Sequence, residues 1–269
     1  MPGDRERLRI TFDSVASRYH QARPNYPAEL YDELVRQAQL RPGDRVLEVG
    51  CATGKATVPL AQRGFEMTCI ELGADLAEEA RRNLSQLSAA EVINEAFETW
   101  KPPPGAAYDL VFAATAWHWI DPAVRYQKAW ELLRPGGHLA FWGATHVFPA
   151  DGDPFFHEIQ DVYDEIGEGI PGDLPVADRF PSPDAVPDQG AEIARTGLFT
   201  DIVVRRFDWE IQYTADEYIR LLDTFSGHIA MAPWQRDRLY SEIRLRLDRR
   251  PDGRLRRHWG AVLHVACRR

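Results

Sequence analysis

Five strand-like apolar runs alternate with helix-like segments in the first half of the chain, and this alternation restricts the possible folds more than any other feature. The runs are RVLEVG (45–50), EMTCIE (66–71), EVINEA (91–96), YDLVFAA (108–114) and HLAFWG (138–143). Strands separated by helical segments are typical of βαβ units, in which the strands pair in parallel. The sequence therefore predicts an α/β fold built on a parallel sheet.

Two later runs have strand composition and are separated by a helical stretch. DIVVRRFDWEIQY covers 201–213 and HWGAVLHVACRR covers 258–269. We expect them to add a pair of strands at one edge of the sheet. The predicted organisation is a core over 41–147, a loop-rich insertion rich in proline, glycine and aspartate over 148–200, and edge strands with an intervening helical segment over 201–269. The insertion and the helical segment together could form a cap over the carboxyl ends of the strands, where open α/β sheets bind ligands.

Composition places the chain among globular proteins. Its 269 residues are 44% hydrophobic and 27% charged, close to the average for such domains. No apolar run approaches the roughly 20 residues that span a bilayer, and the start, MPGDRERLRI, is charged. We therefore expect a cytoplasmic protein without a membrane span. The three cysteines lack metal-ligand spacing, so we expect reduced core thiols and no bound metal.

Charge is distributed unevenly along the chain. The formal net charge is -9, but residues 236–269 contain eleven arginines and no lysine against four acidic residues. This segment is either an arginine-studded helix face or a patch that faces an anionic acceptor or an acidic partner. The overall negative charge opposes binding to a nucleic-acid backbone, so nucleic acid is not an expected partner.

A glycine-containing turn follows the first strand in LEVGCATGKAT. Gly50 ends the strand and Gly54 opens the following helix, so the turn can be tight and a ligand can approach the backbone closely. The dinucleotide pattern G-x-G-x-x-G is absent, since Ala52 stands at the middle position. The spacing thus argues against a nicotinamide-dependent oxidoreductase, the alternative that such a turn raises.

Acidic residues follow the next two strands. Glu71 stands twenty-one positions beyond Gly50, at the end of the second strand, where a carboxylate can accept both hydroxyls of a ribose. The alternative is a solvated acid at a strand end. After the third strand, Asn94-Glu95-Ala96-Phe97 offers an acid and amides that could read an adenine edge while Phe97 packs on the ring. An ordinary loop is the competing interpretation.

These motifs together resemble the class I S-adenosylmethionine-dependent methyltransferases, in particular the small-molecule branch called type 11 or UbiE-like. The resemblance covers about 41–145 through VLEVGCATGKAT, CIELGADL, NEAFE, YDLVFAATAWHWID and LLRPGGHLAFW, and includes the preceding segment TFDSVASRYHQARPNYP. It implies a Rossmann-like doubly wound seven-stranded sheet of order 3-2-1-4-5-7-6 with the last strand antiparallel. It also implies an N-terminal helical lid over 1–40 and a cofactor-binding core over 41–147.

The resemblance also implies site residues for the cofactor, S-adenosylmethionine, and its product, S-adenosylhomocysteine. The implied cofactor contacts are Glu48, Gly50, Cys51, Ala52 and Gly54 at the methionine and ribose end, Glu71 and Leu72 at the ribose, Glu95, Ala96 and Phe97 around the adenine, and Ala114, Thr115 and Ala116 beneath the methionine. Tyr19 and Arg23 lie on or after the N-terminal helix that folds over the cofactor in this branch. Arg23 could pair with the methionine carboxylate, or it is a surface arginine before Pro24.

The stretch AWHWID, after the fourth strand, is the expected meeting point of cofactor and acceptor. Trp117 and Trp119 could shape an apolar pocket or attract the sulfonium, and His118 is the candidate general base. A hydrogen-bonded structural histidine is the competing interpretation of His118. His146, beyond the fifth strand, is a second candidate base or a loop histidine. The predicted acceptor contacts are Trp117, His118, Trp119 and Trp142, and the cap aromatics Phe155, Phe156, His157, Tyr163, Phe225, His228 and Trp234 are equally explained by core packing.

The predicted function is methyl transfer from S-adenosylmethionine to a small-molecule acceptor with an oxygen, nitrogen, sulfur or carbon nucleophile. In-line displacement needs positioning and exclusion of water rather than a covalent intermediate, so the lack of a Ser-His-Asp arrangement does not count against an enzyme. Two alternatives stay open: an RNA or tRNA methyltransferase that uses the arginine-rich C-terminal region, and a non-catalytic S-adenosylmethionine-binding regulator. We expect a monomer or a homodimer.

Overall fold

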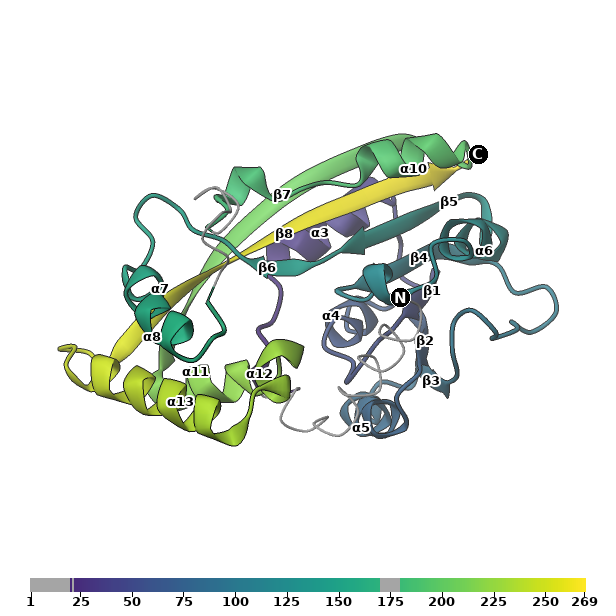
Figure 1. The fold of residues 1–269 in the computed structure, drawn as a ribbon. Helices are drawn as coiled ribbons and strands as arrows, with labels where there is room; N and C mark the ends of the chain where they lie inside the picture. The colour runs from purple at the N-terminus through teal and green to yellow at the C-terminus, as the bar shows by residue number, and fades with distance from the viewer. Residues whose placement is uncertain (1–19, 21, 170–179) are drawn as a thin grey trace.

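One mixed sheet forms the centre of the molecule (Figure 1). The computed structural model describes residues 20, 22–169 and 180–269. In these ranges eight strands pair in the order β3-β2-β1-β4-β5-β8-β6, and β7 pairs with β8. The strands are β1 (Arg45–Val49), β2 (Glu66–Glu71), β3 (Ala90–Asn94), β4 (Tyr108–Ala114), β5 (Leu133–Trp142), β6 (Ala144–His146), β7 (Phe199–Thr214) and β8 (Arg254–Arg268).

The predicted topology is confirmed. Strands β1 to β5 pair in parallel, and β8 is antiparallel to β5. The fifth predicted strand, 138–143, ends near Gly143 as expected, but a short strand, β6, follows it directly, so the described chain has eight strands in place of seven. Both strands pair with β8, β5 along 264–267 and β6 along 259–261, while β7 pairs with the other edge of β8 over nearly its whole length. Counting β5 and β6 together restores the expected order.

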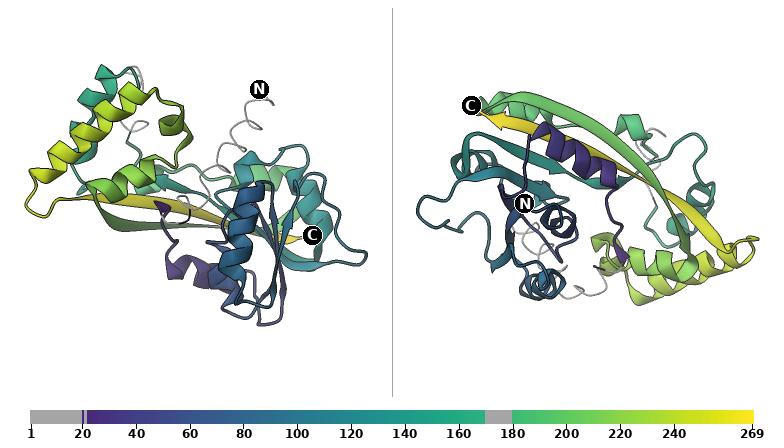
Figure 2. Two further views of the ribbon diagram at one scale, coloured as in Figure 1. Left: turned by 90° about the horizontal axis from the view of Figure 1, so that it is seen from below. Right: turned by 180° about the vertical axis from the view of Figure 1, so that it is seen from behind.

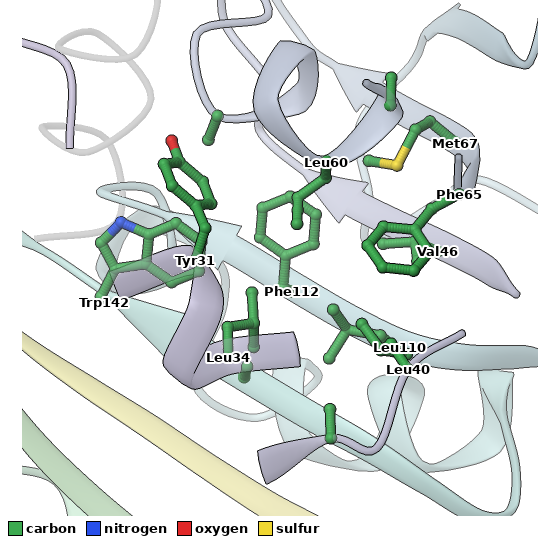
Figure 3. Close-up of a cluster of buried hydrophobic side chains, with 14 of the residues drawn as sticks. Tyr31, Leu34, Leu40, Val46, Leu60, Phe65, Met67, Leu110, Phe112 and Trp142 are labelled. Carbon is green, nitrogen blue, oxygen red and sulfur yellow. The ribbon is translucent and has the colours of Figure 1, made fainter. Parts of the chain in front are cut away.

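Helices cover both faces of this sheet, as expected for a doubly wound fold. One face carries α3 (Ala28–Gln37), α4 (Thr57–Ala61) and α5 (Ala74–Leu84), whose apolar residues join one buried cluster with Leu110 and Phe112 (Figure 3). The other face carries α6 (Arg125–Leu132) and α10 (Gly190–Thr196). Alternate strand residues point to opposite faces, so Leu47 and Val111 join the second cluster. Both clusters exclude water, which stabilises the sheet.

A group of helices lies where β7 ends and β8 begins, and we call this group the cap lobe. Its members are α7 (Phe155–Glu158), α8 (Gln160–Glu165), α11 (Ala215–Leu222), α12 (Ser226–Ala230) and α13 (Pro233–Asp248). Figure 2 shows the cap lobe beside the sheet, with β7 and β8 running from one to the other. Leu239, Ile243 and Leu247 recur every four residues along α13 and are fully buried, so one helix face packs into the lobe's own apolar cluster.

The segment that we expected to be a single cap insertion, 148–200, is divided between the two parts of the molecule. Helices α7 and α8 pack in the cap lobe, whereas α10 lies against β7 with Ile193 buried in the sheet cluster. Hydrophobic residues in the insertion contact two separate cores, which its loop-rich composition does not reveal. The domain boundaries drawn from the sequence stay predictions.

Most arginines of 236–269 form ion pairs inside the protein. Arg238 pairs with Glu165 and Glu242, Arg244 with Asp216, Arg246 with Asp161 and Glu242, Arg250 with Asp153, Arg254 with Glu217, and Arg256 with Glu210. These pairs favour the predicted helix face over a patch for an external partner, but this face accounts only for the arginines of α13, since Arg250, Arg254 and Arg256 lie after the helix. No helix in the described part of the chain is both long and apolar enough to cross a membrane.

Candidate active site

A cavity of about 330 Å³ opens at the carboxyl ends of β1, β2 and β4. Its wall combines strand-end residues with Phe225 and Ser226 of the cap lobe. The predicted site residues that line it are Arg23, Gly50, Ala52, Glu71, Leu72, Glu95, Phe97, Ala114, Thr115, Ala116, His118 and Trp119. Glu48 and Cys51 line a smaller neighbouring cavity of about 40 Å³, which Arg23, Gly50 and Ala52 also border. The topology thus brings most of the predicted residues to one place.

The turn after β1 requires a glycine at position 50. Gly50 has a φ of +71°, and a Cβ there would lie 2.6 Å from the Cβ of Ala116 in the turn after β4. A side chain would push these two turns apart, so their close approach depends on the missing Cβ. Ala52 and Thr115 also lie in the left-handed region, at φ of 48° and 55°. Such backbone conformations cost free energy in non-glycine residues and concentrate at ligand sites.

Gly54 has a different place from the one predicted. Helix α4 begins only at Thr57, and the Gly54 N–H donates to the carbonyl of Cys51 within the turn. A Cβ on Gly54 would contact Leu84 of α5. The missing side chain of Gly54 therefore lets the turn pass close to α5. Gly54 is not among the described residues that line either cavity.

Glu71 is held at the edge of the cavity by backbone donors. Its two carboxylate oxygens accept from the N–H of Ala52 and of Gly73, each at 2.8 Å. Asn94 donates to the carbonyls of Glu71 and Leu72, which ties the ends of β2 and β3 together. Each carboxylate oxygen can accept more than one hydrogen bond, so a group held this way can also accept from a pair of ribose hydroxyls.

Glu48 lies under the same turn in a very different environment. Its carboxyl is 1% exposed and accepts a 2.5 Å hydrogen bond from the hydroxyl of Thr57. Burial raises the pKa of Glu48 to about 8, and the nearby charge of Glu71 adds to the shift. Glu48 is therefore predominantly protonated at neutral pH. The contact with Cys69 and burial likewise raise the pKa of Cys51, which keeps this free cysteine a thiol.

Of the three residues predicted to contact the adenine, two line the cavity and one stabilises the loop behind it. Glu95 and Phe97 line the cavity, and Phe97 is 2% exposed with the Lys128 ammonium 5.2 Å from its ring centroid. Ala96 contributes its carbonyl to the N–H groups of Thr99 and Trp100, so it stabilises the loop behind the wall.

Two tryptophans predicted to contact the acceptor are core residues and are not among the described residues that line either cavity. Trp117 stacks on Phe141 with ring centroids 5.1 Å apart. Trp142 stacks on Phe112 at 5.4 Å beneath α3 (Figure 3). Both are 2% exposed. His118 and Trp119 take the cavity side of the short 3-10 turn Trp117–Trp119 instead, with ring centroids 4.8 Å apart.

His146 does not lie at the cavity mouth, contrary to the prediction. It lies in β6 and packs on Phe148 and Phe156, with ring centroids 4.0 and 4.3 Å away. Burial lowers its pKa, and the positive charge of Arg257 adds to this shift. A neutral histidine packed among cap-lobe aromatics is a structural residue. Tyr19 lies outside the described residues.

Arg23 and Tyr26 connect the N-terminal segment to the site. Arg23 donates to the carbonyl of Thr224 at 2.8 Å, and its guanidinium lies 4.2 Å from the ring centroid of Phe225. It is half-buried and borders both cavities, so it is not a simple surface arginine. Tyr26, which we did not predict, shares a 2.6 Å hydrogen bond with the Thr115 hydroxyl. Tyr26 belongs to the segment ARPNYP, and the family resemblance of that segment is the one sequence feature that could have pointed to it.

Of the cap aromatics, Phe225 contributes to the cavity wall, whereas Phe155 and Phe156 are buried in the lobe and Trp234 is 60% exposed. The wall as a whole suits S-adenosylmethionine chemically. The Glu71 carboxylate, fixed by two backbone donors, suits a pair of ribose hydroxyls, and the apolar surface around Phe97 beside Glu95 suits a flat ring. At Gly50 and Thr115 the backbone itself forms part of the wall. The individual binding roles stay predictions.

Comparisons with known proteins agree with this geometry. A family model described as Methyltransferase domain matches residues 46–137. An uncharacterized methyltransferase of Mycobacterium tuberculosis is 31% identical over 166 residues, covering 57% of this chain and 65% of that protein. The chain therefore spans slightly less than two thirds of that relative. The malonyl-[acyl-carrier protein] O-methyltransferase of Enterobacter lignolyticus is 30% identical over 186 residues, covering 69% of this chain and 67% of that protein.

A solved structure shares the fold over most of both chains. It is a SAM-dependent methyltransferase from Geobacter sulfurreducens in complex with S-adenosyl-L-homocysteine, with a TM-score of 0.51 at 17% identity. The match covers 92% of this chain and 93% of that one. Strand order, the turn after β1 and these relatives lead to one conclusion: the chain belongs to the S-adenosylmethionine-dependent methyltransferases.

Proposed function

We propose that this protein transfers the methyl group of S-adenosylmethionine to a small-molecule acceptor and releases S-adenosylhomocysteine. The observation that carries the proposal is a single cavity bordered on one side by the strand-end residues of the family's cofactor motifs and on the other by Phe225 and Ser226 of the cap lobe. A cofactor at the sheet edge would then meet an acceptor entering beneath the cap.

The proposed cofactor contacts follow the geometry of the wall. Glu71 accepts from the ribose hydroxyls, Glu95 and Phe97 frame the adenine, and the turns at Gly50 and Ala116 border the methionine end. Arg23, which borders both cavities, is the proposed partner of the methionine carboxylate. S-adenosylmethionine, when bound, supplies an electrophilic methyl group on a sulfonium, and the protein's task is to orient the acceptor and exclude water.

His118 is the proposed residue for proton removal from the acceptor. It borders the cavity and is exposed, so an incoming hydroxyl, thiol or amine can reach its imidazole. Trp119 beside it offers a flat apolar surface for the rest of the acceptor. Among oxygen, nitrogen, sulfur and carbon acceptors, His118 favours those that lose a proton during the transfer.

A nucleic-acid acceptor is less well supported. Most arginines of the basic segment already pair with acidic residues of the cap lobe, of β7 or of the loop before α7, so they do not form a free row of phosphate contacts. The relative from Enterobacter lignolyticus is named for methylating a malonyl group on a carrier protein. A small acceptor, carried or not, agrees with a cavity of about 330 Å³.

The first test is calorimetric titration of the purified chain with S-adenosylmethionine, S-adenosylhomocysteine and NAD. We expect micromolar binding of both adenosyl ligands and none of NAD. Transfer of a radiolabelled methyl group to a mixed panel of small acids, amines, phenols and thiols then tests turnover. If neither adenosyl ligand binds, the proposal is rejected; if both bind and nothing in the panel is methylated, the regulatory alternative gains support.

A further inference from the structure

Arg257 is a buried cation in the middle of the cap lobe. It lies on β8 and is 6% exposed, unlike the neighbouring arginines that form ion pairs at the surface. In the described part of the chain, no carboxylate lies within ion-pair distance of its guanidinium. Among the residues that the structure describes, the guanidinium makes one hydrogen bond, from Nη1 to the hydroxyl of Tyr218 at a long 3.5 Å, and its buried Nε has no partner.

The groups around Arg257 do not neutralise it. Burial lowers the pKa of His228 to about 4 and raises the pKa values of Tyr163, Tyr213 and Tyr218, so all four are uncharged at neutral pH. The rings of Trp259 and Phe225 lie against the guanidinium, and a second cation, Arg23, packs on the same Phe225 ring. An unpaired charge in such a place has a large desolvation cost, which a protein tolerates where the charge serves a ligand.

These two rings connect Arg257 to the candidate active site. The guanidinium carbon lies 4.4 Å from the ring centroid of Trp259 and 5.4 Å from that of Phe225. Trp259 lines the smaller cavity and Phe225 lines the larger one. Phe225 directly precedes α12 and is half-buried, and the guanidinium carbons of Arg23 and Arg257 lie 4.2 and 5.4 Å from its ring centroid. Arg257 therefore lies directly behind the cap-side wall.

We propose that the methyl acceptor carries a carboxylate and that Arg257 binds this group when the Phe225 ring turns aside. This inference rests on the proposed function and names the acceptor's chemical class. A guanidinium matches a carboxylate with two parallel N–H donors. A single cation among apolar rings balances one negative charge, which fits a carboxylate better than a doubly charged phosphate. The Tyr218 hydroxyl accepts from Arg257, so its own proton can be donated to a carboxylate bound there.

Equilibrium binding to the complete chain tests this assignment. After saturation with S-adenosylhomocysteine, the protein is titrated with benzoate, phenylacetate, octanoate and succinate, and with the amide of each acid. We expect at least one acid to bind at least about ten-fold more tightly than its amide. Arg257→Met should abolish that preference, whereas the control Arg244→Met, which removes an exposed cap-lobe arginine, should retain it.

The outcomes separate this inference from the proposed function. Equal binding of acids and amides, or a preference that survives in Arg257→Met, overturns the inference. Failure of S-adenosylhomocysteine to bind rejects the proposed function itself. Binding of S-adenosylhomocysteine with methyl transfer only to uncharged acceptors rejects the carboxylate alone.

Thermal stability distinguishes a ligand-binding cation from a structural one. If Arg257 serves a ligand, Arg257→Met removes an uncompensated charge, and the melting temperature of the ligand-free protein stays level or rises. A fall of several degrees would show that the contacts with Trp259 and Tyr218 hold the lobe together, which contradicts the proposal. Arg257→Lys should recover part of the acid preference because it restores the charge without the paired donors.

Discussion

At the scale of single residues, Glu48 and Glu71 show how position decides the state of a carboxyl group. Glu71 ends β2, and Glu48 is the penultimate residue of the neighbouring β1. Glu71 accepts two backbone hydrogen bonds at the cavity edge, and Glu48 is enclosed beneath it with a hydroxyl donor. The first is suited to accept from a ligand, while the second acts as a neutral packing group. The residue type alone does not separate these roles.

Glu71→Gln tests the ribose contact. The amide keeps the size of the side chain but loses one acceptor oxygen, so one backbone N–H and one ribose hydroxyl lose a partner. We expect affinity for S-adenosylhomocysteine to fall about ten- to a hundred-fold, with a loss of roughly 1–3 kcal/mol in stability. Calorimetry and urea unfolding measure the two effects. Glu66→Gln, at the exposed start of β2, is the control, and unchanged affinity in Glu71→Gln would refute the contact.

Glu48 makes the stability of the ligand-free protein depend on pH. Its pKa rises from an ordinary value of 4.5 to about 8 on folding, so the folded state retains a proton that the unfolded state loses. This contribution is fully present below pH 4.5 and decreases as pH rises towards 8, by roughly 1.4 kcal/mol per pH unit. Urea unfolding from pH 5 to 9 should show the slope, relative to Glu48→Gln, which has no proton to lose. Parallel curves for the two proteins would contradict a raised pKa.

Gly50→Ala tests the close approach of the turns after β1 and β4. The new Cβ would meet Ala116 at 2.6 Å in a left-handed backbone, and we expect a loss of about 2–4 kcal/mol together with weaker cofactor binding. Gly43→Ala is the matched control, because Gly43 has a φ of +91° with no atom within 4 Å of the added carbon. The difference between the two variants isolates the steric contact. If both lose the same stability, the close approach is not what requires a glycine at position 50.

At the scale of elements, strand order and the main turn could be predicted from the sequence, because alternation and glycine spacing are local signals. The direction of the aromatic side chains could not. Trp117 follows β4 and Trp142 is the last residue of β5, yet each packs into a core formed with elements distant in the sequence. His146 likewise depends on the separate strand β6 and on Phe156, which comes from the cap lobe.

The turn Trp117–Trp119 should separate stability from catalysis. Trp117→Ala leaves a hole beside Phe141, and we expect a loss of about 3–5 kcal/mol in stability. His118→Ala changes an exposed side chain, so we expect little change in stability and retained binding of S-adenosylhomocysteine. Turnover with the best acceptor of the panel should fall about a hundred-fold in His118→Ala. An unaltered rate would reduce His118 to a wall residue.

At the scale of the whole molecule, the cap lobe has its own apolar cluster but contributes to a site on the sheet. Two long strands and the contact between Arg23 and Thr224 connect the parts. The sequence indicated a cap from composition, but the division of 148–200 between two cores depends on packing that composition does not encode. An acceptor site formed between separately packed units can change through the lobe while the cofactor motifs stay the same.

Asp153 anchors the cap lobe, and its removal should loosen the lobe alone. The carboxylate is 5% exposed, pairs with both terminal nitrogens of Arg250 at 2.8 Å, and accepts from the N–H of Arg256 and Phe155. Asp153→Asn leaves the Arg250 charge without its partner, at a cost of about 3–5 kcal/mol.

The Asp153 carboxylate connects the start of α7 to the loop between α13 and β8. In Asp153→Asn, hydrogen exchange should therefore become faster in α7, α8 and α13, while β1 to β4 keep their protection. Asp216→Asn, which removes an exposed pair with Arg244, is the control and should leave both regions unchanged. Faster exchange throughout the sheet would mean that the cap lobe and the sheet unfold as one cooperative unit, and a change confined to the lobe would establish it as a separate one.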